Sequence, residues 1–148
     1  MSKSPVAKKS AVSAKKSATI TKSPPKRGLL VMGEWLDRIF DPTNPKTWEI
    51  RTMSCKPGRT FLIGSKGLGI LGECTIKECI ETTKGELLTP ESFEKHRIPN
   101  KRISEYTGKN KQVFIWALKD VVRYDTPIAY RTTPGCVIWC KQGLPTSY

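Results

Sequence analysis

Alternating apolar and polar side chains predict most of the secondary structure of this chain. The clearest case is the short stretch after Lys46, where Trp48 and Ile50 point to one side of an extended strand. Glu49 and Arg51 point to the other side, and the long side chain of Lys46 reaches the same polar patch. The apolar side is suited to a protein core. The polar side has two interpretations: a ligand-binding face, or a solvated face with one Glu–Arg pair.

Short runs of the same kind predict five further strands. They are residues 29–32, 60–65, 70–80, 112–124 and 136–140. Between the second and third of these runs, the glycine-rich stretch 64–69 predicts a tight hairpin whose main chain can approach a ligand closely. This stretch lacks the Gly-Lys-Ser/Thr ending of a phosphate-binding loop, so we exclude that interpretation.

Two segments have the spacing of short helices. Residues 34–40 place apolar side chains three and four positions apart, and residues 89–96 begin with Thr89 at the cap and Pro90 in the first turn. Residues 98–111 are polar and are expected to be irregular. Because several strands are apolar on both faces, the pattern predicts a small closed or nearly closed barrel. The expected fold class is α+β, mainly β, with five to six strands and two short flanking helices.

Residues 1–27 form a basic segment that differs from the rest of the chain. They hold seven of the lysines, one arginine and no acidic residue, which is +8 of the net charge of +13. With few apolar side chains, this segment is expected to be a disordered tail that engages a polyanion. The Ser-Pro steps at Ser4 and Ser23, each near basic residues, are similar to linker-histone tails and also to proline-directed phosphorylation sites. A nuclear import signal and a solubilising leader are further interpretations.

The five cysteines, together with the lack of a secretion signal, predict reduced thiols in an intracellular protein. The pairs 74/79 and 136/140 are spaced too widely for a CxxC zinc site, so we interpret them as small buried hydrophobic residues and expect no metal or cofactor. No apolar run is long enough to cross a membrane. The sequence gives no indication of oligomeric state.

Several blocks of the sequence, taken in order, resemble the ASCH domains of the PUA-like barrel superfamily. The opening blocks are Leu29–Val31, Trp35–Ile39 and the run Lys46-Thr47-Trp48-Glu49-Ile50-Arg51. Later blocks are residues 69–72, 96–99, 114–120, 127–130 and 134–139. The chain departs from the family pattern at Asn44, where family members commonly have a glycine two residues before the lysine. The resemblance implies an ASCH domain over residues 28–148, preceded by the tail.

The resemblance also implies a cleft on the barrel that accepts RNA, in preference to DNA, or a nucleobase-like ligand. In this interpretation Lys46 and Arg51 supply positive charge, while Glu49 orients Arg51 and accepts a hydrogen bond from a base edge. Trp116 is a candidate stacking face, and Tyr106 and Tyr130 are candidates for lining the cleft. The full set of candidate binding residues is Lys46, Glu49, Arg51, Ser65, Trp116 and Tyr130. His96 ends a predicted helix, where a cation interacts well with the helix dipole.

Enzymes within the same family imply a second interpretation. One is an amidohydrolase acting on acylated cytidine, in which a lysine aligned with Lys46 assists a threonine aligned with Glu49; another is a ribonuclease. A carboxylate at position 49 does not carry over that covalent chemistry, but Lys46 and Glu49 still form a possible acid–base pair of a small hydrolase. A third interpretation assigns the function to the tail, which docks on chromatin or a protein partner while the barrel is a scaffold.

Overall fold

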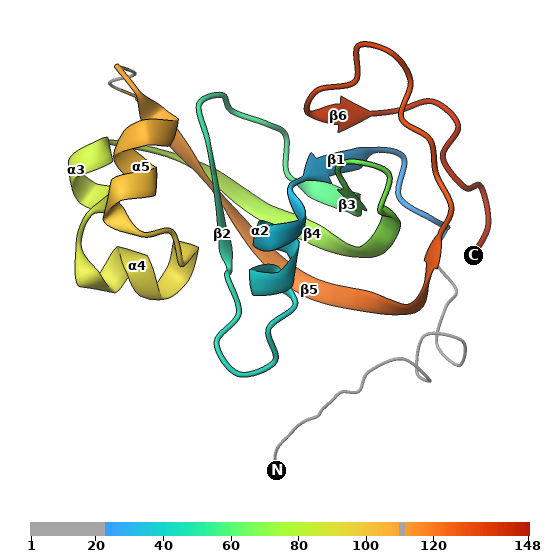
Figure 1. The fold of residues 1–148 in the computed structure, drawn as a ribbon, viewed down its shortest axis with the longest axis horizontal. Coiled ribbons are helices and arrows are strands. Elements are labelled where there is room, and N and C mark those ends of the chain that lie inside the picture. Colours follow the sequence, from blue (N-terminus) through green and yellow to red (C-terminus); the bar gives the residue numbers. More distant parts are fainter. Residues whose placement is uncertain (1–22, 110–111) are drawn as a thin grey trace. The chain divides into compact units, whose positions relative to one another are not determined.

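A computed structural model describes residues 23–109 and 112–148 and is drawn in Figure 1. The described residues contain a six-stranded sheet with the strand order β2-β5-β4-β3-β1-β6. The strands are β1 (Gly28–Val31), β2 (Trp48–Arg51), β3 (Gly58–Gly64), β4 (Gly69–Thr82), β5 (Val113–Ile128) and β6 (Trp139–Cys140). The predicted fold class, α+β and mainly β, is confirmed, and each predicted strand is present.

Four helices lie in the described part of the chain, two more than predicted. They are α2 (Gly33–Ile39), α3 (Lys84–Leu87), α4 (Pro90–His96) and α5 (Asn100–Thr107). The expectation that residues 98–111 are irregular is therefore wrong for α5. This helix buries only Ile103 and Thr107, so its apolar face was too narrow to appear in the sequence pattern.

The chain divides into two compact units, which we describe separately. Among the described residues, unit 1 contains residues 23–36, together with Arg59–Cys74 and Asp120–Tyr148. Unit 2 contains Asp37–Gly58 and Thr75–Lys119.

In unit 1, β1 pairs in parallel with β3 and antiparallel with β6. The hydrophobic core of unit 1 contains the buried side chains of Phe61, Ile63, Ile70 and Tyr124. The predicted hairpin joins β3 to β4, and three of its residues have positive φ: Lys66, Gly67 and Gly69. At Gly69 a β-carbon would lie 2.7 Å from the main-chain oxygen of Ile128, so only glycine fits there.

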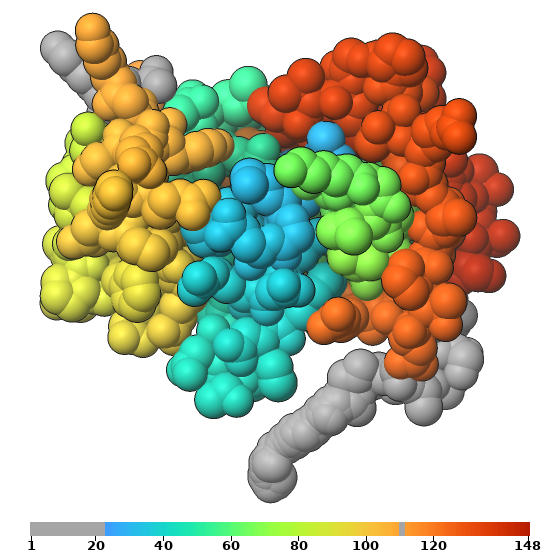
Figure 2. Space-filling model, viewed as in Figure 1, coloured from blue at the N-terminus to red at the C-terminus, as the bar shows by residue number. Residues whose placement is uncertain are grey.

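In unit 2, β2 pairs antiparallel with β5, so that Glu49 lies opposite Trp116 and Arg51 opposite Phe114. Helices α3, α4 and α5 gather into one group, visible as the yellow and gold surface in Figure 2. Their buried side chains include Leu87, His96 and Ile103. Each buried leucine or isoleucine contributes about 1.5–3 kcal/mol relative to exposure.

The sequence analysis predicted that the domain starts at Gly28, but packed residues are present before this position. Pro24 and Pro25 are buried. The guanidinium of Arg27 lies 4.5 Å from the ring centroid of Trp139, and its Nε donates to the main-chain oxygen of Arg59 at 3.2 Å. The last residues of the predicted tail are thus held against unit 1, whereas residues 1–22 lie outside the described residues.

The expectation of reduced cysteines is wrong for one pair. Cys136 and Cys140 form a disulfide with their Cα atoms 5.8 Å apart. The chain bends at residues 137 and 138, between these two cysteines, which are four positions apart. Of the other three, Cys74 is buried, while Cys55 and Cys79 are only partly buried. The described residues contain no cluster of potential metal ligands, and none of their helices is long and apolar enough to cross a membrane.

Candidate functional site

The residues before β2 are held by main-chain hydrogen bonds to three other residues of unit 2. Lys46 N–H donates to the oxygen of Arg38 at the end of α2, and Thr47 N–H donates to the oxygen of Lys95 in α4, both at 2.8 Å. The oxygen of Thr47 accepts from Leu118 N–H in β5, also at 2.8 Å. This fixed main chain determines where the Lys46 side chain begins.

The Lys46 side chain is buried, with 1% of its surface exposed. Its Nζ donates to the main-chain oxygens of Trp48 at 2.8 Å and His96 at 2.9 Å, and lies 3.6 Å from Glu49 Oε1. Three acceptors match the three hydrogens of an ammonium group. Burial lowers the pKa of Lys46 to about 8, opposed by the Glu49 carboxylate, so the group is mostly protonated at neutral pH.

Glu49 and Arg51 form a close ion pair next to this lysine. Arg51 Nε and its terminal nitrogen contact Glu49 Oε2 at 2.8 and 2.6 Å. The Arg51 side chain is 12% exposed and that of Glu49 is 5% exposed. Together with Lys46, the cluster carries two positive charges and one negative charge. The fixed guanidinium is therefore part of a pre-ordered site with a net positive charge.

Trp116 lies next to the cluster, but it does not offer a stacking face. Its indole is wholly buried at 0% exposure, and Nε1 donates to the main-chain oxygen of Met53 at 3.0 Å. The Arg51 guanidinium lies 5.6 Å from the centroid of the Trp116 ring, where a cation–π interaction stabilises its position. Alternation along β5 grouped Trp116 with Phe114 and Leu118, but it could not show that the ring is wholly buried.

Tyr106 on α5 is the exposed aromatic residue near this cluster. It is 50% exposed. Burial raises the pKa of its hydroxyl, with the positive charge of Arg51 lowering that pKa and the negative charge of Glu49 raising it. Tyr106 thus lies within electrostatic reach of the ion pair and keeps a large part of its surface open. It is one of the two tyrosines that the sequence suggested for lining the cleft.

His96 is a neutral, buried residue, and the expected helix-end cation is wrong. Its Nε2 donates to the oxygen of Leu87 at 2.8 Å, and its Nδ1 accepts from Ile98 N–H at 2.9 Å. A ring nitrogen that accepts an N–H carries no proton. Burial and the nearby Lys46 lower the pKa of His96, although the hydrogen bond to Leu87 raises it. The residue positions the carbonyl that holds Lys46.

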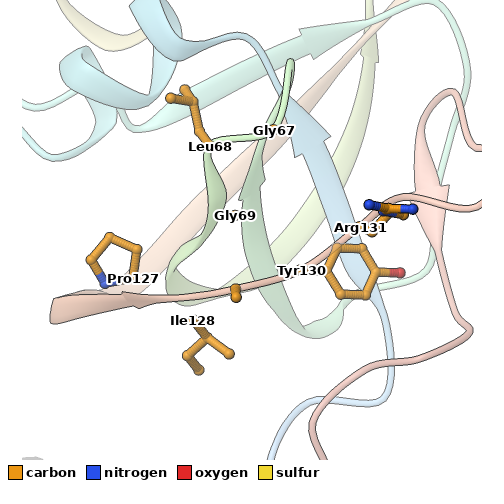
Figure 3. Close-up of a pocket in the computed structure, with 8 residues that line it drawn as sticks. Gly67, Leu68, Gly69, Pro127, Ile128, Tyr130 and Arg131 are labelled. Carbon is orange, nitrogen blue, oxygen red and sulfur yellow. The ribbon is translucent and has the colours of Figure 1, made fainter.

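The other two candidate residues, Ser65 and Tyr130, belong to unit 1. Ser65 is partly buried and its N–H donates to the oxygen of Val31 at 2.9 Å. The Tyr130 hydroxyl donates to the oxygen of Gln142 at 2.6 Å. Tyr130 lines a shallow pocket of about 480 Å³ with the glycine turn and the end of β5. Figure 3 shows Tyr130 and Arg131 at one end of this pocket and Pro127 at the other.

The fold is that of ASCH domains. Crystal structures of a tyrosine-to-phenylalanine mutant and a serine-to-alanine mutant of ZmASCH from Zymomonas mobilis each match with a TM-score of 0.60 at 14% sequence identity. They cover 71% and 72% of this chain and 76% of their own chains. ASCH from the same organism matches with a TM-score of 0.57 at 13% identity, over 66% of this chain and 68% of that one.

No family model matches the sequence, and no curated protein is significantly similar to it. The resemblance inferred from sequence blocks is thus confirmed at the level of the fold.

Proposed function

We propose that the protein binds nucleic acid, RNA in preference to DNA, and that the Lys46–Glu49–Arg51 cluster receives a nucleotide. The observation that carries this proposal is the fixed Arg51 guanidinium. It is held by Glu49 at 2.6 Å, and the buried ammonium of Lys46 lies 3.6 Å from the other oxygen of the same carboxylate. A fixed arginine fork with excess positive charge is suited to a phosphate or to the carbonyl edge of a base.

Tyr106 supplies the second part of the proposed site. A half-exposed phenol ring beside an arginine is suited to stacking with an unpaired base, which is worth about 1–3 kcal/mol per base. Stacking on aromatic side chains combined with readout of base edges is the usual way in which proteins recognise single-stranded RNA. Glu49 accepts a hydrogen bond from the base edge in this arrangement.

Two further parts of the chain contribute to the proposed binding. The basic segment 1–27 adds sequence-independent affinity through its eight positive charges. In unit 1, the shallow pocket lined by Tyr130 and Arg131 supplies an aromatic ring and a cation for a further contact with nucleic acid.

The proposal is tested by binding of a short, fluorescently labelled single-stranded RNA to the full chain and to single variants. Arg51→Gln and Tyr106→Ala are each expected to weaken binding about tenfold, the loss expected for one charged or one stacking contact. Lys101→Gln is the matched control, because Lys101 is an exposed cation on the same helix as Tyr106. Equal affinity of all four proteins would contradict the proposal.

A small hydrolase acting on a nucleoside or RNA is the second candidate function. It is favoured by the contact of 3.6 Å between Lys46 and Glu49 and by the pKa of Lys46, lowered to about 8. Turnover of N-acylated cytidine or of RNA, lost in Glu49→Gln while ligand binding remains, would identify this activity. Absence of turnover with intact binding would exclude it.

A further inference from the structure

The segment 23–27 carries a sequence feature that the proposed nucleic-acid site does not use. The chain contains five Ser-Pro or Thr-Pro steps, which begin at Ser4, Ser23, Thr89, Thr126 and Thr133. Ser23 is the one that is followed by a basic residue, Lys26, three positions later. A serine before proline with a cation at that distance is the pattern that proline-directed kinases recognise.

Ser23 lies at the surface of unit 1, beside an arginine. The residue is exposed and belongs to neither a helix nor a strand. Its main-chain oxygen accepts a hydrogen bond from a terminal nitrogen of Arg59 at 2.5 Å. The other terminal nitrogen of Arg59 contacts Glu73 Oε2 at 2.8 Å and the Tyr148 hydroxyl at 2.6 Å. The guanidinium thus links this segment to β4 and to the end of the chain.

Two lysines line the same pocket as Ser23. Ser23, Lys26 and Lys141 line one pocket of about 320 Å³ in unit 1. Lys26 and Lys141 are both exposed, so their amino groups can move toward a new charge at Ser23. Lys26 and Lys141 thus line the same pocket as this serine, and Arg59 bonds its main-chain oxygen; among the described residues, Glu73 is the carboxylate in contact with that arginine.

We propose that Ser23 is a phosphorylation site and that Arg59 and Lys141 bind its phosphate. This proposal does not depend on the nucleic-acid site. In the reaction, Ser23 Oγ forms a bond to the γ-phosphorus of ATP, the bond from that phosphorus to the β-phosphate oxygen breaks, and the hydroxyl proton passes to the kinase base. The product carries about −1.5 to −2 charges at pH 7, together with three acceptor oxygens.

The burial of Pro24 and Pro25 determines the order of events. A kinase that reads the Ser-Pro step reaches it while residues 23–27 are detached from unit 1. Once formed, the phosphate gains charge-assisted hydrogen bonds when the segment returns to Arg59 and Lys141. Phosphorylation is therefore expected to tighten the attachment of this segment to unit 1.

The phosphate-binding part is tested on the full chain with phosphoserine encoded genetically at position 23. Neighbouring cations favour the doubly charged phosphate, so its second pKa, followed by ³¹P NMR, is expected below the value of about 6 for free phosphoserine.

Phosphoserine encoded at position 4 is the matched control. Lys141→Gln and Arg59→Lys are expected to raise the pKa of the phosphate at position 23. Lys141→Gln keeps the test decisive if the arginine variant does not fold. Equal phosphate pKa values at positions 4 and 23, unchanged by Lys141→Gln, would overturn this part.

The modification itself is tested with a purified proline-directed kinase, ATP and the full chain, followed by peptide mass mapping. Phosphate is expected on Ser23 first, to be absent in Ser23→Ala and to form more slowly in Lys26→Ala. Arg27→Ala, which removes the contact with Trp139, is expected to speed the reaction because the segment detaches more often. An unmodified Ser23 in both the natural chain and Arg27→Ala would overturn the proposal.

Discussion

His96 shows how a single buried residue supports the candidate site. Its ring bonds two main-chain groups, and its own carbonyl accepts from Lys46 Nζ at 2.9 Å. The sequence could place this histidine at a helix end, but it could not show that the ring is enclosed and neutral, since that depends on the positions of Leu87 and Ile98. A role as a surface cation and a role as a buried hydrogen-bonding residue have the same sequence pattern.

The neutral state of His96 predicts a loss of stability in mild acid. The unfolded chain takes up a proton near pH 6.5, whereas burial lowers the pKa of His96 in the folded protein. The unfolded state thus binds more protons, and the free energy of unfolding is expected to fall as pH drops from about 6.5 toward the lower folded pKa. Urea unfolding at pH 7 and pH 5.5 measures this. In His96→Gln the protein is less stable at both values, but the part of the pH dependence due to His96 disappears; an unchanged dependence would contradict a neutral histidine.

Replacing Lys46 tests how much the buried charge contributes. Lys46→Met removes the donor from two main-chain oxygens, and each buried acceptor left unsatisfied costs about 1–3 kcal/mol, while Glu49 stays paired with Arg51. Lys101→Met, at an exposed lysine, is expected to change stability by less than about 0.5 kcal/mol. Urea unfolding of both variants measures the difference. Similar values for the two would mean that Lys46 is not held as described.

At the scale of elements, the sequence patterns predicted the strands well. Buried and partly buried residues alternate along much of β4, whereas β3 is buried on both faces over residues 60–64. The helix at residues 90–96 was also predictable, since Thr89 caps it through a hydrogen bond from Ser92 N–H at 3.2 Å. The short helices α3 and α5 were not predicted. Their few buried residues, such as Leu87 and Ile103, gain stability from packing against each other's helices rather than from a pattern within each helix.

Part of the candidate site was also predictable from the sequence. Alternation grouped Glu49 with Arg51, and the length of the Lys46 side chain brought it to the same patch; both contacts are present. The roles of these residues in binding stay predictions. The burial of Trp116 was not predictable, because it depends on elements far away in the sequence.

The turn between β3 and β4 allows a matched test of close packing. Gly67 and Gly69 both have positive φ, but a β-carbon at Gly67 meets nothing within 4 Å, whereas at Gly69 it meets the Ile128 oxygen at 2.7 Å. Gly67→Ala is expected to cost about 1–2 kcal/mol for the left-handed conformation alone. Gly69→Ala adds a further cost of about 1–3 kcal/mol for the clash. Urea unfolding compares them, and equal costs would show that the turn moves to accommodate the methyl group.

At the scale of the whole molecule, positive charge is spread unevenly. The net charge is +13, and residues 1–27 hold +8 of it. The Lys46–Glu49–Arg51 cluster carries one net positive charge in a fixed geometry, so its contribution to binding depends on where that charge lies relative to the ligand. The contribution of the basic segment depends on how many phosphates its positive charges neutralise. Sensitivity to salt therefore separates the two contributions.

Changing the six lysines of residues 1–22 to glutamine is expected to flatten the salt dependence of RNA binding. If all six neutralise phosphates of a single strand, the slope of log affinity against log salt decreases by about 4. Arg51→Gln decreases the slope by about 1. Fluorescence titrations across a salt series measure both. Complete loss of binding in the six-lysine variant, with no effect of Arg51→Gln, would assign the function to the basic segment alone.

The chain contains one histidine in 148 residues, and that histidine supports the candidate site. Histidine-selective isotope labelling of the natural protein therefore gives one imidazole spin system, with no assignment experiment and no introduced tag. Because the His96 carbonyl and Trp48 carbonyl share the Lys46 amino group, a ligand that displaces this lysine changes the surroundings of the labelled ring. Chemically diverse nucleosides can thus be screened one by one against a single built-in reporter inside the protein.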